Sequence, residues 1–147
     1  MHASNPWKSY RQIATKTAPP GQLILMLYEG ALRSLERALP GFDHDDPAEA
    51  NTIVHNNLQR AQEIIRELNL ALNMEKGGEF AATLRRLYDY FEHRLWQSNL
   101  KKERGGVEEV IRHLTVLRNA WADMLSQQGS VPRPSSELSL SPCLMPA

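Results

Sequence analysis

Apolar residues recur along most of the chain at helical spacing, in four stretches separated by short breaks. The clearest stretch lies between residues 47 and 73, where neither glycine nor a further proline interrupts the pattern. Its apolar positions advance by four and three residues in turn, as in a heptad repeat: Val54, Leu58, Ala61, Ile65, Leu68 and Leu72. This spacing predicts one long amphipathic helix, about 40 Å in length at 1.5 Å per residue.

Prolines and glycines divide the rest of the pattern into three further helices. The first of the four is predicted from Pro20 to Leu39, because proline fits a first helical turn and Pro40-Gly41 should end the helix. Asp46 is predicted to cap the heptad helix, which then begins at Pro47. A third helix is predicted from about residue 79 to 102, between the double glycines at 77–78 and 105–106. The last helix is predicted to follow the second glycine pair. The apolar stripes of these two helices are Phe80, Leu84, Leu87, Phe91 and Leu95, and then Val107, Val110, Ile111, Leu114, Leu117, Trp121 and Met124.

Four long amphipathic helices joined by short loops predict an all-α fold, an antiparallel four-helix bundle. No stretch alternates convincingly between apolar and polar residues, as a strand would. We expect the bundle domain to cover residues 7–126, including a short extra N-terminal helix or arm at residues 7–16. Residues 127–147 hold four prolines among serines and show no helical period, so we predict a disordered C-terminal tail.

Composition and spacing remove several classes of function. The formal net charge is zero, which argues against a nucleic-acid binder, and a single cysteine, Cys143, permits no disulfide within the chain. The first nine residues lack the apolar core of a secretory signal and no apolar run could span a bilayer, so we expect a cytoplasmic protein. No Glu-x-x-His motif and no helical pair of histidines four apart occurs. We therefore predict no metal, no cofactor and no catalytic residues.

The helices carry more apolar surface than a bundle core requires. On the helix that begins at Pro20, apolar side chains cover an arc of about 200°, where a core-facing stripe needs little more than 100°. Leu25 and Leu32 lie on one edge of this arc. Along the heptad helix, Leu70 points away from the stripe, whereas one edge of it carries Ile53, Ile64 and Ala71. Two interpretations remain open: neighbouring helices cover these edges, or the edges line grooves for an incoming amphipathic chain.

Several segments match one known family, and they occur in the order in which that family has them. Tyr10, followed by residues 17–30 (Thr-Ala-Pro-Pro-Gly-Gln-Leu-Ile-Leu-Met-Leu-Tyr-Glu-Gly), resembles the signature opening of the FliS family of flagellin export chaperones. Further resemblance lies in residues 61–68, in Leu72-Asn73, in residues 87–90, in Arg94-Leu95 and Asn99-Leu100, and from residue 107 to Trp121. One departure is Pro19, where the family usually has serine or threonine; proline cannot supply a side-chain cap for the helix.

The resemblance implies a cytoplasmic chaperone that binds the disordered C-terminal region of flagellin. Binding would prevent premature polymerisation and hold the subunit for the flagellar type III export gate, without nucleic acid, membrane insertion or a cofactor. The chaperone would be a monomer or a weak homodimer. From the residues, we expect the N-terminal arm to act as a movable cover, because Pro19-Pro20 separates this short segment from the bundle and little core holds it. Together with the apolar edges, this predicts the following partner-binding residues: Tyr10, Ile13, Leu25, Leu32, Ile53, Ile64, Leu70 and Ala71. The alternative is a non-enzymatic helical adaptor that forms a homodimer through its apolar edges.

Overall fold

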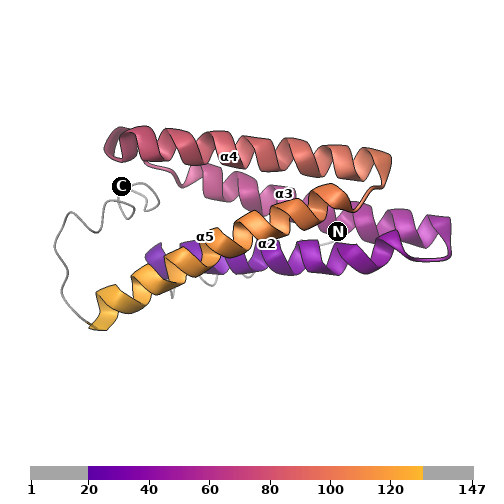
Figure 1. Cartoon of the computed structure of the whole chain (residues 1–147), viewed down its shortest axis with the longest axis horizontal. Coiled ribbons are helices and arrows are strands. Elements are labelled where there is room, and N and C mark those ends of the chain that lie inside the picture. The colour runs from indigo at the N-terminus through magenta and orange to yellow at the C-terminus, as the bar shows by residue number, and fades with distance from the viewer. Residues whose placement is uncertain (1–19, 131–147) are drawn as a thin grey trace, which may run out of the picture.

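Four α-helices make up the part of the chain that the computed structural model describes, residues 20–130. They are α2 (Pro20–Phe42), α3 (Pro47–Leu70), α4 (Met74–Lys101) and α5 (Gly105–Ser130). Each connecting loop has only three or four residues, and the chain reverses at every loop, so that successive helices are antiparallel (Figure 1). The predicted all-α fold of four packed helices is confirmed. The N-terminal arm and most of the predicted tail lie outside the described residues, although α5 continues past the expected domain end at residue 126.

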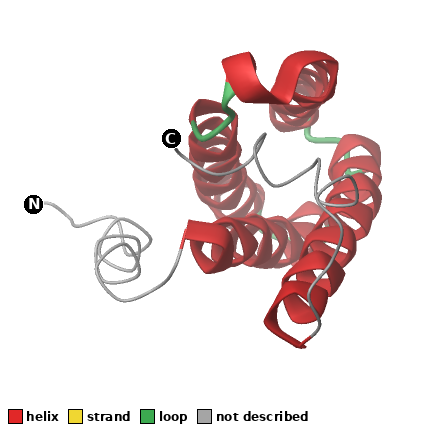
Figure 2. Ribbon diagram, turned by 90° about the vertical axis from the view of Figure 1, so that its left-hand side faces the viewer, coloured by secondary structure: helices red, strands yellow, loops and turns green. Residues whose placement is uncertain are grey.

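The helices form a ring in which α2 and α4 occupy opposite corners. Helix α2 packs against α3 and α5, and α4 packs against the same two helices from the other side (Figure 2). The interface between α2 and α3 is the most extensive of the four. Helix α5 runs obliquely to the others: it begins beside the end of α4 and crosses in front of α2 (Figure 1).

The core is built from the predicted apolar stripes and from one polar pair. All six residues of the predicted heptad stripe are buried, five of them on α3 and Leu72 in the loop that follows it. Across the ring, the hydroxyls of Tyr28 on α2 and Tyr88 on α4 lie 2.6 Å apart and share a hydrogen bond. Burial raises the pKa of Tyr28 to about 12 and raises the pKa of Tyr88 well above its ordinary value. Near the start of α2, the indole of Trp121 donates a 2.8 Å hydrogen bond to the carbonyl of Gly21.

The helix ends differ from the sequence prediction in several places. Helix α3 ends at Leu70, before residue 73, and α5 includes the glycine pair that was predicted to precede it, since it begins at Gly105. Pro40 does not end α2, which continues to Phe42. A proline in the last turn removes only one helical hydrogen bond, and the turn then closes through bonds from the Asp43 and His44 amides to the carbonyls of residues 40 and 41. Helix α4 begins at Met74, five residues before the predicted start, because the Asn73 side chain accepts a hydrogen bond from the Lys76 amide.

The glycine pair at 77–78 bends α4 instead of preceding it. Gly78 has φ 51°, a left-handed value that glycine adopts without a side-chain clash, and the two parts of α4 meet there at a kink.

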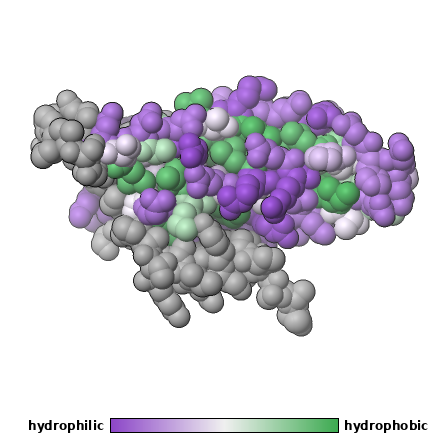
Figure 3. Space-filling model, turned by 90° about the horizontal axis from the view of Figure 1, so that it is seen from below, coloured by the Kyte–Doolittle hydropathy of each residue, from purple (hydrophilic) through white to green (hydrophobic). Residues whose placement is uncertain are grey.

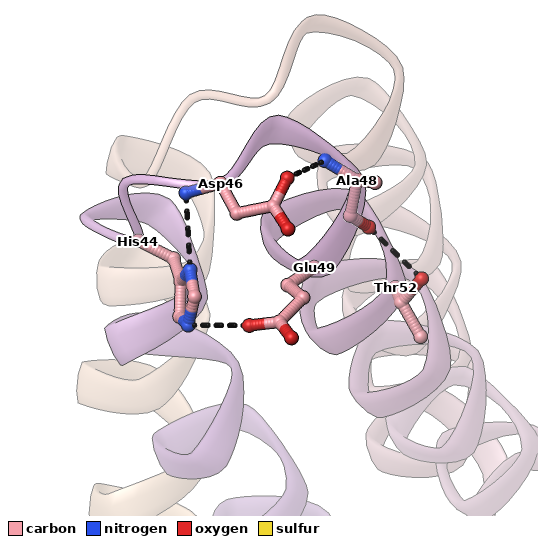
Figure 4. A network of polar contacts seen from close by, with 5 residues as sticks. All are labelled: His44, Asp46, Ala48, Glu49 and Thr52. Atoms are coloured by element: carbon pink, nitrogen blue, oxygen red, sulfur yellow. Dashed lines mark hydrogen bonds and ion pairs between the residues drawn. The ribbon is translucent and has the colours of Figure 1, made fainter.

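The start of α3 shows the predicted cap in detail (Figure 4). The Asp46 carboxylate accepts a 3.1 Å hydrogen bond from the Ala48 amide, and Pro47 occupies the first turn. His44 braces the same loop: one ring nitrogen accepts from the Asp46 amide at 3.3 Å, and the other lies 3.0 Å from the Glu49 carboxylate. These contacts fix where the chain turns from α2 into α3.

A candidate partner-binding surface on both sides of helix α2

Six of the eight predicted partner-binding residues lie in the described part of the chain, and they fall on or beside α2 and α3. Leu25, Leu32, Ile53 and Ala71 are half-buried, whereas Leu70 is 72% exposed and points away from the core as predicted. Tyr10 and Ile13 lie outside the described residues. Seen from below the view of Figure 1, apolar side chains form green patches along the molecule between polar ones (Figure 3).

The two leucines of α2 border helix α5. Leu25, Glu29 and Leu32 share one helix face, because residues four and seven positions apart along a helix project in similar directions. The carboxylate of Glu29 on that face accepts hydrogen bonds from Arg118 of α5, at 2.7 Å from Nη2 and 3.2 Å from Nε. We call this line of contact, with Leu25, Glu29 and Leu32 on α2 and Arg118 on α5, the α2–α5 seam.

The predicted residues of α3 lie on the other side of α2. A side-chain carbon placed on Gly41 of α2 would be 2.8 Å from the Ile53 side chain, and one placed on Gly30 would be 3.4 Å from that of Ile64. Small residues on α2 thus let the two helices approach closely. We call this line, with Ile53 and Ala71 at its outer margin, the α2–α3 seam.

Ile64 does not lie at the exposed margin, and its predicted placement there is wrong. Its side chain is only 3% exposed, because it packs in the interface between α2 and α3, where it faces Gly30. The helical wheel placed Ile64 beside Ile53 and Ala71 but carried no information on how closely the neighbouring helix approaches.

A shallow hollow lies beside Ile53 at the beginning of α3. It has a volume of ≈ 250 Å³ and is lined by Ala48, Glu49, Thr52 and Ile53. The hollow is large enough to accept an apolar side chain from a partner. All four lining residues belong to α3, so the hollow lies beside the α2–α3 seam, close to the loop that His44 and Asp46 hold in place.

The face of α4 carries two exposed apolar residues that the sequence analysis did not single out. Trp96 is 55% and Leu100 is 66% exposed, and the Trp96 ring stacks on His93 with ring centres 6.0 Å apart. Both lie off the apolar stripe of α4, and this position in the helical pattern could have predicted that they are exposed. They lie on the helix opposite α2 and do not contribute to either seam.

Between α4 and α5, polar side chains close the bundle surface. The Glu109 carboxylate accepts hydrogen bonds from the Tyr90 hydroxyl at 2.6 Å and from Arg94 Nε at 2.9 Å. The hydrogen bond from Tyr90, followed by that from Arg94, lowers the pKa of Glu109. His113, four residues further along α5, lies 3.8 Å from the same carboxylate. This cluster links the exposed faces of α4 and α5 and has a structural role.

The described residues form apolar surfaces suited to binding a partner. Within residues 20–130, no three His, Cys, Asp or Glu side chains gather as a metal ion would require. None of the helices in that range combines the length and apolar character needed to cross a bilayer. What the arrangement supplies is apolar surface on both sides of α2, at spacings that suit helical segments.

Comparison with known proteins gives a consistent result. The sequence profile of the family described as "Flagellar protein FliS" matches residues 3–128. The flagellar secretion chaperone FliS of Bacillus subtilis is 38% identical over 128 residues, which cover 87% of this chain and 92% of that protein. The FliS chaperone of Salmonella typhimurium is 36% identical over 126 residues, which cover 82% of this chain and 90% of the relative.

The profile covers all four helices, and the similarity to each of these relatives extends over more than four-fifths of the chain. The resemblance seen in the ordered segments from Tyr10 to Trp121 is therefore confirmed. The chain belongs to the FliS family of flagellar secretion chaperones, which are not enzymes.

Proposed function

We propose that this chain is an export chaperone for flagellin that binds the disordered C-terminal region of its client. Bound in this way, flagellin cannot polymerise prematurely and stays available to the flagellar type III export gate. The proposal places the protein in the bacterial cytosol, without nucleic acid or a cofactor. The observation that carries it is membership of the FliS family along the whole helical bundle.

The surface beside α2 supports this proposal. Leu25 and Leu32 on one side, and Ile53 and Ala71 on the other, are half-buried apolar side chains at the edges of two helix interfaces. An amphipathic helix that folds on binding would cover such edges with its own apolar face. A disordered client can cover a large surface at modest affinity, because part of the interaction energy offsets its ordering. Modest affinity suits a client that must later be released.

We assign the contacts to these four residues and to Leu70, together with Tyr10 and Ile13 of the arm. Ile64 is left out because it has almost no accessible surface. The arm would cover the seams until flagellin displaces it. The export gate would recognise the complex of chaperone and client.

The proposal is tested by mixing the full chain with flagellin from the same cell. Light scattering after size exclusion should show a one-to-one complex, and calorimetry should show binding that disappears when the C-terminal segment of flagellin is removed. A flagellin shortened at its N-terminus is the matched control and should bind as the full client does. A permanent homodimer that ignores flagellin would instead support the helical adaptor.

A further inference from the structure

The ion pair between Glu29 and Arg118 interrupts an otherwise apolar seam. Leu25 and Leu32 flank Glu29 on α2, and Ile111 and Leu125 of α5 pack as half-buried side chains against the core. Because α2 and α5 are antiparallel, Leu25 lies toward the Trp121 end of the α2–α5 seam and Leu32 toward the opposite end. A helix laid along the seam would therefore meet apolar surface, then charge, then apolar surface again.

Hydrogen-bonding capacity is left over at the centre of this seam. Both bonds between the two side chains use one carboxylate oxygen, Oε2 of Glu29, and Arg118 Nη1 also donates to Asn119 at 3.0 Å. Arginine has five N–H groups, so two of those on Arg118 and the Oε1 atom of Glu29 have no partner within residues 20–130. Both side chains are about one-third exposed, so the remaining groups are accessible to a partner at the bundle surface.

A client helix that covers the seam buries these groups. A buried ion pair then destabilises the complex unless its remaining donors and acceptors find partners. A carboxamide is well suited to satisfy both ions at once, because it carries its acceptor and its donors on two neighbouring atoms: its oxygen can accept from Arg118 while its nitrogen donates to Glu29. A carboxylate in the same place would face the like charge of Glu29.

The geometry points to Glu29 and Arg118 as the residues that set the register of the client in the α2–α5 seam. This inference rests on the proposed function and names the chemistry of the client. The bound segment of flagellin is an amphipathic helix with two apolar residues about seven positions apart, which contact Leu25 and Leu32 across about 10.5 Å. Between them it presents an asparagine or glutamine to the ion pair. A helix shifted by one turn brings an apolar residue there and is rejected, as a single buried polar residue selects register in a coiled coil.

The test pairs variants of the chaperone with variants of flagellin. Each asparagine and glutamine in the C-terminal segment of flagellin is changed to alanine in turn, and affinity is measured by calorimetry. We expect one position at which alanine weakens binding to the wild-type chaperone at least about tenfold. The same change should weaken binding less than about twofold in the double variant Glu29→Met/Arg118→Met, whose seam is apolar throughout.

Single variants and a second ion pair give the controls. Arg118→Met alone should weaken flagellin binding at least about tenfold, because the client would bury Glu29 without its partner, and the double variant should bind more tightly than Arg118→Met, because it buries no unpaired charge. Arg66→Met/Glu92→Met removes a comparable ion pair, 3.0 Å long, between α3 and α4 and should leave affinity unchanged. Melting curves identify any variant that fails to fold, and Arg118→Gln then replaces Arg118→Met.

The outcomes separate the inference from the proposed function. If the wild-type chaperone binds flagellin but no amide position depends on the ion pair, the inference is wrong and the proposed function stands. The inference is also wrong if Arg118→Met binds flagellin like the wild type, or if the control pair changes affinity equally. If the wild type binds no flagellin, both are wrong.

Discussion

At the scale of single residues, two adjacent glycines at the start of α5 have different surroundings. A side-chain carbon on Gly106 would lie 2.2 Å from the Ser98 hydroxyl and 2.8 Å from the Arg94 guanidinium. A carbon on Gly105 would meet nothing within 4 Å. Gly106 therefore allows the close approach of α4 and α5, whereas Gly105 does not take part in it.

Changing each glycine to alanine should separate these roles. We expect Gly106→Ala to lower the free energy of unfolding by about 1–3 kcal/mol, because the added methyl group pushes the two helices apart. Gly105→Ala should leave it unchanged or raise it by less than about 1 kcal/mol, since alanine favours helix. Urea titration of both variants is the measurement. Equal effects would show that the packing of α4 against α5 does not depend on Gly106.

The buried pair Tyr28 and Tyr88 predicts how stability depends on alkaline pH. Burial raises the pKa of Tyr28 to about 12 and raises that of Tyr88 well above the value near 10 expected in the unfolded chain. Above pH 10 the unfolded state therefore releases protons that the folded state still holds. The free energy of unfolding should be unaffected by this pair below about pH 10 and should fall above it, by about 1.4 kcal/mol per pH unit for each tyrosine.

The measurement compares urea unfolding of the wild type at about pH 8 and about pH 11. The variant Tyr28→Phe/Tyr88→Phe is the control, because it keeps both rings in the core and loses the titrating hydroxyls. Its stability should fall less over the same interval, since only the remaining groups titrate. A parallel fall in both proteins would mean that the pair does not govern alkaline stability.

At the scale of helices, the local sequence pattern was sufficient to predict which face of a helix is buried, but it could not predict the contacts between helices. The heptad pattern predicted six core residues correctly, five of them on α3, because burial on one helix face repeats with the helical period. On α4 the pattern selected Phe80 and Leu87, which are half-buried, whereas Ala81 and Tyr88 occupy the core. Tyr88 is acceptable there because its hydroxyl bonds to Tyr28, sixty residues away in the chain. No local pattern contains that partner.

The candidate site shows the same division. Helical wheels placed Leu25, Leu32 and Ile53 at the edges of their stripes, and all three are half-buried. They could not show that Ile64 would be covered, because this depends on how closely another helix, with Gly30 opposite Ile64, approaches it. Nor could they show that Arg118, eighty-nine residues further along the chain, would reach Glu29 between the two leucines.

Edge and core positions should respond differently to mutation. We expect Leu32→Asp to weaken flagellin binding at least about tenfold, because it puts a charge on the α2–α5 seam, while the folded bundle persists. Ile65→Ala, at a position with 0% exposure, should instead lower the free energy of unfolding by about 2–5 kcal/mol. Ile64→Asp should unfold the protein, since it buries a charge.

Melting curves and calorimetry with flagellin give the two readouts for the same set of variants. A Leu32→Asp protein that does not fold would show that Leu32 belongs to the core. A folded Ile64→Asp protein that loses flagellin would restore Ile64 to the binding surface.

At the scale of the whole molecule, the two seams lie on opposite sides of α2. The α2–α5 seam contains Leu25 and Leu32, and the α2–α3 seam contains Ile53 and Ala71. A helix with its side chains is about 10 Å wide, as wide as α2 itself, so one straight client helix cannot occupy both seams. A client that contacts both must consist of two helical parts joined by a segment that passes over or around α2.

A client in two parts should bind by avidity. If the C-terminal segment of flagellin is divided into two peptides, we expect each to bind weakly and the undivided segment to bind about a hundredfold tighter or more. The reason is that the first part, once bound, holds the second at a millimolar effective concentration near its seam. Calorimetry of each peptide, alone and after saturation with the other, is the measurement.

The two peptides should bind together without competing, and Leu32→Asp should weaken only one of them. If one peptide binds as tightly as the whole segment, a single seam is sufficient. If the peptides compete for one place, the seams do not act as separate sites, and the second apolar edge of α2 then needs a different explanation.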